Sequence, residues 1–234
     1  MSAERLPGKP LLEVNGLPII CHVVKKAQET QIGEVVVATE DEEILNIVKK
    51  NHGEAILTSK TPQTGTDRIW EAFQKLKDNK IKYIINLQGD EPLIDIDDIK
   101  NLHSHMIKTK SKMGTLASVI SNKNLYAEKS VVKVKTKQSL EQSKFPEAIN
   151  FMRKIEGNIE NIYHHLGVYC YNFETLKKLI SLSQSQNEVK NKLEQLRALD
   201  NNIKINVALA NYSPIGVDTM EDYVAIKKIM EYKS

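Results

Sequence analysis

Hydrophobic residues recur along the chain in two periods, and these periods predict an alternation of helices and strands. Helices are predicted where apolar residues return every three to four positions, at residues 19–30, 41–51, 69–76, 99–107, 188–199 and 221–232. Strands are predicted where short runs are rich in β-branched and aromatic residues, at 35–39, 54–58, 83–87, 114–120, 131–135, 163–171 and 205–210. Residues 136–161 carry no clear pattern.

The order of these elements predicts the fold class. Strands and helices alternate through the first half of the chain, which is typical of βαβ units with right-handed crossovers. We therefore expect an α/β fold with a mainly parallel sheet. The runs at 35–39 and 83–87 are almost wholly apolar, so we expect both strands to be buried.

The composition excludes more classes of function than classes of fold. The 234 residues suffice for one sizeable domain or for a domain with a small lobe. Acidic and basic residues nearly balance, at 30 and 33, and no basic stripe stands out, which argues against a nucleic-acid partner. No apolar run approaches the roughly 18 residues of a membrane span, and no signal peptide is evident, so we expect no membrane partner.

The two cysteines suggest a reducing compartment. Cys21 and Cys170 lie far apart and neither belongs to a CxxC pair, so neither a zinc site nor a disulfide framework is indicated. We expect a cytoplasmic protein.

Gln88, Gly89 and Asp90 follow the predicted strand 83–87 directly, within the hexapeptide Leu-Gln-Gly-Asp-Glu-Pro. Ligands of open α/β sheets collect at the carboxyl ends of strands. Glycine permits close backbone approach, and aspartate supplies the hard oxygen that Mg²⁺ prefers when it already holds phosphates. The alternative is a polar turn, since Gly, Asp and Pro are common turn residues.

Two earlier loops have residues suited to anions. Residues 5–10, Arg-Leu-Pro-Gly-Lys-Pro, offer Arg5 and Lys9 to a polyphosphate, although a frayed basic terminus has the same composition. Residues 62–68 place hydroxyls around a glycine ahead of a helix and end in an arginine fork. An ordinary capped helix is the alternative there.

Histidines 164 and 165 invite a metal site, but strand alternation places them on opposite faces, so one ion is not easily held by both. His165 and Tyr169 share a face and are suited to hydrogen-bonding a polyol. Thr219 or a neighbour is expected to cap the last helix.

Six pieces, taken in order, resemble one family: Arg-Leu-Pro-Gly-Lys-Pro-Leu, Thr-Gly-Thr-Asp-Arg, Gln-Gly-Asp-Glu-Pro, His-Leu-Gly-Val-Tyr, Leu-Glu-Gln-Leu-Arg and Gly-Val-Asp-Thr. The resemblance covers nearly the whole chain and is to the 3-deoxy-manno-octulosonate (Kdo) cytidylyltransferases. It implies a Rossmann-like nucleotidyltransferase domain with a small β-rich dimerisation insertion at about residues 122–175. It also implies a homodimer that joins CTP to Kdo with Mg²⁺, giving CMP-Kdo and pyrophosphate for lipopolysaccharide synthesis.

The resemblance also implies roles for particular residues. It implies catalytic roles for Lys9, Asp90 and Asp218, with Asp90 and Asp218 as the Mg²⁺ ligands. The nucleotide-binding positions that it implies are Arg5, Lys9, Thr64, Gly65, Thr66 and Arg68. The sugar-binding positions that it implies are Gln88, Arg153, His165, Tyr169, Glu194 and Gln195.

The sequence departs from the family pattern in places. The family begins with an apolar strand before the Arg-Leu-Pro-Gly-Lys loop, whereas Met1 falls within that loop, so we expect an N-terminally shortened sequence. Members commonly have Arg where His164 stands and Glu where Asn191 stands. Three alternatives remain open: a transferase for another acidic sugar such as 8-amino-Kdo or a sialic acid, a non-catalytic nucleotide-binding relative, and a nucleic-acid module.

Overall fold

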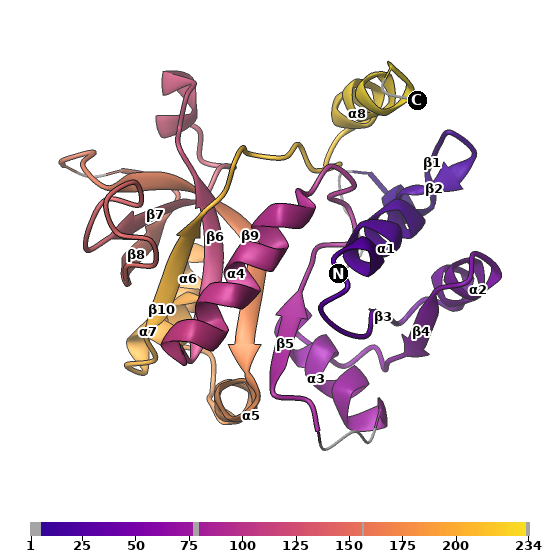
Figure 1. Cartoon of the computed structure of the whole chain (residues 1–234), viewed down its shortest axis with the longest axis horizontal. Coiled ribbons are helices and arrows are strands. Elements are labelled where there is room, and N and C mark those ends of the chain that lie inside the picture. Colours follow the sequence, from indigo (N-terminus) through magenta and orange to yellow (C-terminus); the bar gives the residue numbers. More distant parts are fainter. Residues whose placement is uncertain (1–5, 77–79, 156, 233–234) are drawn as a thin grey trace. The chain divides into compact units, whose positions relative to one another are not determined.

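The computed structural model describes residues 6–76, 80–155 and 157–232. Its contacts divide the chain into two compact units, each built from segments that are distant in sequence (Figure 1). Unit 1 comprises residues 1–79, 87–97 and 214–234, and unit 2 comprises residues 80–86 and 98–213. Within the described residues, no helix is both long and apolar enough to cross a membrane.

Unit 1 combines short strands with the helices that cover them. Its elements are η1 (Lys9–Leu11), β1 (Glu13–Val14), β2 (Leu17–Pro18), α1 (Ile19–Glu29), β3 (Val36–Thr39), α2 (Glu42–Lys50), β4 (Glu54–Leu57), α3 (Gly65–Leu76) and α8 (Met220–Tyr232). β3 and β4 pair in parallel with α2 between them, as predicted for a βαβ unit. β1 and β2 form a hairpin around Asn15 and Gly16, whose positive φ angles of 51° and 69° suit an Asn-Gly turn.

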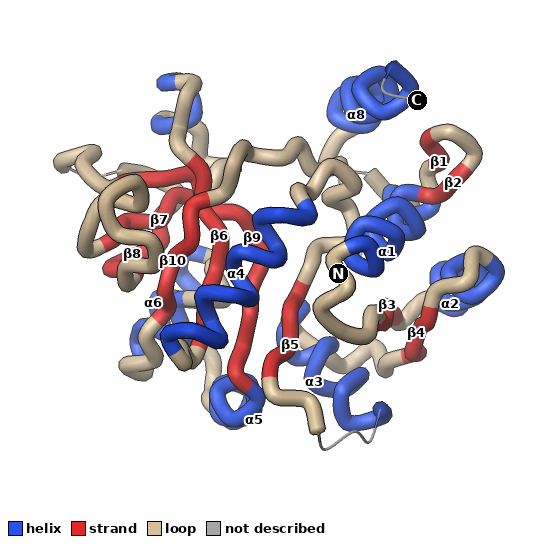
Figure 2. Tube along the Cα trace, viewed as in Figure 1, coloured by secondary structure: helices blue, strands red, loops and turns tan. Residues whose placement is uncertain are grey.

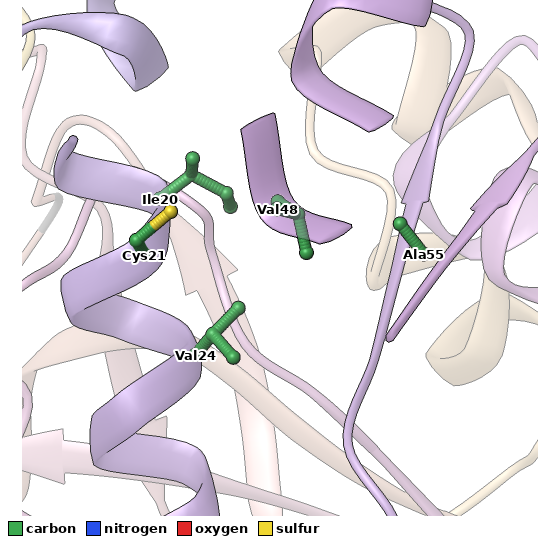
Figure 3. Close-up of a cluster of buried hydrophobic side chains, with 5 residues drawn as sticks. All are labelled: Ile20, Cys21, Val24, Val48 and Ala55. Atoms are coloured by element: carbon green, nitrogen blue, oxygen red, sulfur yellow. The ribbon is translucent and has the colours of Figure 1, made fainter. Parts of the chain in front are cut away.

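The core of unit 1 follows from the helical spacing of apolar residues. Ile20, Cys21 and Val24 on α1 meet Val48 of α2 and Ala55 of β4 (Figure 3). A second buried cluster joins Val14, Ile19, Val217 and Ile226. Because this second cluster joins the start of the chain to its end, it positions two loops that are some 200 residues apart in sequence.

Unit 2 is built on a six-stranded sheet, drawn as red strands in Figure 2. Its elements are β5 (Tyr83–Asn86), α4 (Ile96–Thr109, in unit 2 from Asp98), β6 (Met113–Ser118), η2 (Lys123–Tyr126), β7 (Lys133–Thr136), β8 (Ala148–Met152), β9 (Ile162–Asn172), α5 (Phe173–Ser181), α6 (Gln186–Asn191), α7 (Leu196–Asp200) and β10 (Ile205–Leu209). The strand order is β10-β6-β9-β7-β8, and β5 also pairs with β9.

The α/β class is confirmed, and the sheet of unit 2 is mixed. β10 pairs with β6 in parallel, whereas β9 runs antiparallel to β5, β6 and β7. The long strand β9 carries β6 along one edge and β7 and β5 along the other. Residues 122–175 therefore contribute strands to the same sheet as β6 and β10, and their role in dimerisation stays a prediction.

Helix α4 packs directly onto β6 at a glycine. A Cβ atom on Gly114 would lie 2.8 Å from Met106 Sδ and 3.0 Å from Leu102 Cδ1, both on α4. A larger residue at Gly114 would therefore have to displace these side chains.

Two strands predicted to be buried are only half-buried. Val36, Val37 and Ala38 of β3 are of intermediate exposure, as are the first three residues of β5. Among the described residues, β3 pairs only with β4 and β5 pairs only with β9. An apolar run predicts that its side chains are buried, but the number of strands that flank it determines how completely they are buried.

Three helix or strand predictions also need correction. Helix α3 begins at Gly65 rather than at residue 69. The predicted helix 188–199 is two helices, because Lys192 adopts a left-handed conformation with φ 52° and ends α6. Strand β8, within the patternless stretch 136–161, was missed because antiparallel pairing with β7 defines it.

Candidate active site

Two loops of unit 1 bring Asp90 and Asp218 together, although 128 residues separate them in sequence. The backbone N–H of Val217 donates to the carbonyl of Asp90 at 2.9 Å, so Asp90 is joined to the residue that precedes Asp218. Val217 is fully buried in the cluster with Val14, Ile19 and Ile226. The loop before Asp90 is anchored at Gly89, where a Cβ would lie 2.8 Å from Ile20 Cδ1. The expected convergence of the two aspartates is therefore observed.

Lys9 lies between these carboxylates. Its Nζ donates to Asp90 Oδ2, and it also donates to Asp218 Oδ1 at 3.0 Å. Burial lowers the pKa of Lys9, but hydrogen bonds to Asp90 and Asp218 and their charges outweigh burial and raise it above its ordinary value. Lys9 is therefore protonated at neutral pH and neutralises part of the aspartate charge.

The turn at Gly8 and the helix α8 set this geometry. Gly8 adopts a φ of 71° and precedes the single-turn helix η1, which begins at Lys9. At the other loop, Thr219 caps α8, because Asp222 N–H donates to its hydroxyl at 3.2 Å. This confirms the cap predicted from the sequence and places Asp218 immediately before the helix.

Glu91 is a third carboxyl group beside the pair. Its Oε2 is buried, and no described residue donates a hydrogen bond to it. Burial, followed by the charges of Asp90 and Asp218, raises the pKa of Glu91 to about 7, and the charge of Lys9 opposes this shift. Burial is thus the main cause of the shift, and the two aspartates add to it.

The donor set fits a magnesium ion. Asp90 and Asp218 direct oxygens at one point, and Mg²⁺ is commonly held by one or two carboxylates together with substrate phosphates. Among the described residues, no cluster of three or more His, Cys, Asp or Glu side chains has metal-binding geometry. An ion held here would therefore take its remaining ligands from substrate and water.

The residues predicted at the nucleotide lie around the start of α3. Thr64 precedes this helix, and its hydroxyl donates to Asp67 Oδ2 at 2.8 Å while accepting from Asp67 N–H at 3.2 Å. Gly65 and Thr66 form its first turn, with Thr66 buried. The capped-helix alternative is thus realised, and nucleotide contact stays a prediction; Arg5 lies outside the described residues.

Arg68 is already engaged on three sides. It donates to Glu40 Oε2 and Thr58 Oγ1, both at 2.6 Å, and to the Ser59 carbonyl at 3.2 Å. The hydrogen bond from Arg68 is the main cause that lowers the pKa of Glu40. The guanidinium is therefore oriented by β3 and β4 loop residues, and an anion would compete with Glu40 for it.

Unit 2 gathers predicted sugar-binding residues at an irregularity in β9. The rings of His165 and Tyr169 are 5.4 Å apart, whereas residues four apart in a regular strand are roughly 13 Å apart. The register shifts here, since Thr115 pairs with Tyr169 while Leu116 pairs with Leu166. The bulge therefore brings the two rings together, whereas in a regular strand they would lie on the same face but too far apart to touch.

Thr115 fixes the protonation of His165. Its buried hydroxyl donates to the Val168 carbonyl at 2.7 Å or to the Leu166 carbonyl at 3.2 Å, and it lies 3.1 Å from His165 Nε2. A hydroxyl has one proton, and we assign it to the shortest of these contacts, the Val168 carbonyl. With this assignment, Nε2 donates to Thr115 and Nδ1 is left as an acceptor. Burial, then the charge of His164, lowers the pKa of His165 to about 3, in keeping with a neutral ring.

Tyr169 and Glu194 extend this cluster. The Tyr169 hydroxyl is buried and no described residue hydrogen-bonds to it. Burial first, then Tyr171 and Glu194, raises the pKa of Tyr169 well above its ordinary value, so Glu194 lies near it. Gln195 is buried beside Glu194, in the connection between α6 and α7, whereas Gln88 is exposed and belongs to unit 1.

Arg153 holds the corner between α6 and α7. Its guanidinium donates to the carbonyls of Asn191 at 3.2 Å and Lys192 at 3.3 Å, and to those of Lys129 at 3.2 Å and Ser130 at 3.4 Å. The structure therefore places Arg153 near the Glu194 segment, with its donors bound to backbone.

Sequence reasoning missed Thr115 and Glu40 and gave Glu91 no role of its own. Thr115 is a polar residue within an apolar strand run, and this is the signal that marks it. Glu40 directly follows β3, at a strand end where ligand-binding residues are expected. The opposite placement of the histidines is confirmed, since His164 Nδ1 pairs with Ser213 Oγ at 2.6 Å rather than with Thr115.

The sequence is similar to that of known cytidylyltransferases over most of its length. The sequence profile of the family described as Cytidylyltransferase matches residues 1–205. The 3-deoxy-manno-octulosonate cytidylyltransferase of Thermodesulfovibrio yellowstonii is 40% identical over 239 residues, covering 97% of this chain and 94% of the relative. That of Afipia carboxidovorans is 39% identical over 232 residues, covering 98% of this chain and 93% of the relative.

Solved structures agree. CMP:2-keto-3-deoxy-manno-octonic acid synthetase complexed with CTP superimposes with a TM-score of 0.88 at 32% identity, covering 99% of this chain and 95% of that one. An apo UDP-glucose pyrophosphorylase shares the fold, with a TM-score of 0.73 at 12% identity, covering 100% of this chain and 96% of that one. The motifs, the fold and these matches agree, and the chain belongs to the 3-deoxy-manno-octulosonate cytidylyltransferase family.

Proposed function

We propose that this chain transfers the cytidylyl group of CTP to the anomeric hydroxyl of 3-deoxy-manno-octulosonate, releasing pyrophosphate and forming CMP-Kdo for lipopolysaccharide synthesis. The names of relatives at 39% and 40% identity support the reaction. The 32% identical structure with bound CTP supports the nucleotide. The observation that carries the proposal is the junction of Lys9, Asp90 and Asp218 in unit 1.

The reaction has an electrostatic difficulty that these residues answer. An anionic sugar acid must approach a triphosphate, and negative charge grows on the departing pyrophosphate. Lys9 supplies a point charge for phosphate oxygens. A magnesium ion, when bound, would neutralise phosphate charge; Asp90 and Asp218 are the carboxylates that would hold it.

The neutral cluster of unit 2 suits a polyol. His165 Nδ1 is an acceptor, the Tyr169 hydroxyl is available to donate or accept, and Gln195 adds an amide. Neutral groups bind hydroxyls without adding to the repulsion of an anionic substrate. We propose that the neutral side chains of His165, Tyr169 and Gln195 bind the sugar together with the Glu194 carboxylate, which accepts hydrogen bonds from its hydroxyls. Arg153 then positions the segment carrying Glu194 through the carbonyls of Asn191 and Lys192.

A pyrophosphate-release assay tests the reaction. We expect release with CTP, Kdo and Mg²⁺ together, and none when any of the three is omitted. A panel containing 8-amino-Kdo and a sialic acid identifies the sugar, and UTP and ATP identify the base. Binding of CTP without release of its pyrophosphate in the presence of any of these sugars would contradict the proposal and favour a non-catalytic nucleotide-binding protein.

We further propose a cytoplasmic homodimer, which the family resemblance implies. The exposure of Ile149 on the edge strand β8, at 51%, and of Ile159, at 56%, supports a partner surface on residues 122–175. Light scattering after gel filtration should give twice the 26.6 kDa of one chain. Ile149→Lys should shift that mass toward one chain, with the exposed Val189→Lys as the matched control.

A further inference from the structure

Lys9 occupies the position at which Asp90 and Asp218 converge. One ammonium group serves carboxylates 81 and 209 residues away in sequence. The Lys9 side chain is 14% exposed, Asp90 is 25% exposed and Asp218 is 57% exposed, so the cluster is only partly open to water. Two carboxylates and one ammonium leave a net negative charge, and Glu91 adds a further carboxyl beside them.

A metal ion ligated by both aspartates would have to take the place of this ammonium group. An ion close to both Oδ atoms would lie within a few ångströms of Nζ, where two like charges repel strongly in a partly buried site. The lysine cannot diffuse away, because its backbone is held in η1. The effective concentration of its ammonium group at the carboxylates is therefore on the order of millimolar. Lys9 therefore competes with any metal ion for these oxygens.

A triphosphate changes this competition. It presents several negative oxygens, each an acceptor for a charge-assisted hydrogen bond from an ammonium group. Lys9 has a four-carbon stem and three donors that rotate freely, so its head group can change partners without movement of η1. When the ammonium moves to phosphate, Asp90 and Asp218 lose their counter-ion together.

We propose that Lys9 acts as a tethered counter-ion that keeps divalent cations off Asp90 and Asp218. When a nucleoside triphosphate binds, its phosphates draw the Lys9 ammonium group away from the two aspartates. This inference rests on the proposed function and deepens it. It makes metal and nucleotide binding mutually reinforcing, because each removes an obstacle to the other. Lys9 is then a positioning residue for the metal as well as a contact for phosphate.

Mn²⁺ binding measured by electron paramagnetic resonance, without turnover, tests the proposal. Titrations would use the full chain with and without a non-hydrolysable α,β-methylene analogue of CTP. In the absence of nucleotide, Lys9→Gln should bind Mn²⁺ at least about tenfold more tightly than wild type, since one partly exposed ion-pair partner is removed at each aspartate. In wild type, the analogue should tighten Mn²⁺ binding, and this enhancement should shrink in Lys9→Gln.

Controls separate the local effect from a general change of charge. Lys25→Gln removes the same charge from an exposed position on α1 and should bind Mn²⁺ as wild type does. Lys9→Arg keeps a cation and should keep weak binding. Lys9→Met, which retains the aliphatic stem, repeats the test should Lys9→Gln unfold, with the near-ultraviolet circular dichroism of each variant as the check.

Two results overturn different claims. Equal Mn²⁺ affinity of wild type and the Lys9→Gln and Lys9→Met variants, without nucleotide, would overturn the counter-ion role and leave the metal site intact. Unchanged Mn²⁺ affinity of Asp90→Asn and Asp218→Asn in the presence of the analogue would instead remove these residues from the metal site of the proposed function.

Discussion

The two units solve the problem of placing polar groups in opposite ways. In unit 1 the polar cluster is charged, lies on loops and is partly open to solvent, as shown by the 57% exposure of Asp218. In unit 2 the cluster around Thr115, His165 and Tyr169 is neutral, lies on strands and is buried. Burying an unpaired charge costs far more than burying a hydrogen-bonded neutral group. The contrast teaches that solvent access decides which chemistry each region can carry.

One buried ion pair in unit 2 qualifies that lesson. Arg197 Nε donates to Glu188 Oε2 at 2.8 Å, and Arg197 Nη2 donates to Glu188 Oε1 at 2.5 Å; both side chains are 4% exposed. Burial raises the pKa of Glu188, but the hydrogen bond and charge of Arg197, with further hydrogen bonds, lower it overall. Full bidentate pairing therefore permits charge where solvent does not reach.

The largest expected effect comes from breaking this pair. Arg197→Met leaves the Glu188 carboxylate buried without its partner, and we expect the free energy of unfolding to fall by about 3–5 kcal/mol. Urea denaturation followed by circular dichroism measures it. The double variant with Glu188→Gln should recover part of the loss; a double variant as unstable as the sum of both single variants would show that the charges are not coupled.

Next in size is the effect of the exposed charges on turnover. Asp90→Asn and Asp218→Asn should each lower kcat by about 10² or more, because each removes a carboxylate that would hold the magnesium ion against the phosphates. Unfolding free energies should change little, since both side chains reach solvent. Near-normal rates in either variant would remove that aspartate from the catalytic site.

The neutral cluster should respond in stability to a smaller change. Thr115→Val keeps the shape but leaves the Nε2 donor of His165 without its acceptor, at an expected cost of about 1–3 kcal/mol. Thr115→Ser, which retains the hydroxyl, is the control. Equal destabilisation by both variants would point to lost packing of the methyl group instead.

Counted per pH unit, the smallest expected effect is the pH dependence that His165 gives to stability. Its folded pKa of about 3 lies below the ordinary 6.5, so the unfolded chain binds more protons between these values. Stability should therefore fall as the pH drops below about 6.5, by up to about 1.4 kcal/mol per pH unit from this group. Comparison of wild type with His165→Gln by denaturation from pH 7 to 4 isolates the contribution; parallel curves would contradict it.

Local pattern predicts the helices of unit 1 well and the strands less completely. The spacing of Ile20, Val24 and their neighbours places α1 within one residue of its end, because an amphipathic face is a property of the segment itself. Strand β8 and the half-burial of β3 depend on which strands lie alongside, and no segment carries that information alone. The left-handed Lys192 has no local signal either, since lysine is a good helix former.

The candidate site was predictable in part for a similar reason. Motif resemblance identified Asp90 and Asp218, and the structure shows them meeting through the Val217 to Asp90 backbone hydrogen bond. Thr115 was not predicted, because its role depends on the bulge in β9 that lies opposite it. Residues that bind ligand repeat as motifs, whereas residues that orient them depend on tertiary contacts.

The corner at Lys192 has a practical consequence. Trypsin cleaves after lysine but needs several residues of extended, unbonded chain, and here the carbonyls of Asn191 and Lys192 are both held by Arg153. Cleavage after Lys192 therefore measures how often this corner opens, provided that opening and closing are faster than proteolysis. The rate of cleavage after Lys192, measured by mass spectrometry without any label, thus reports opening of the segment that carries Glu194.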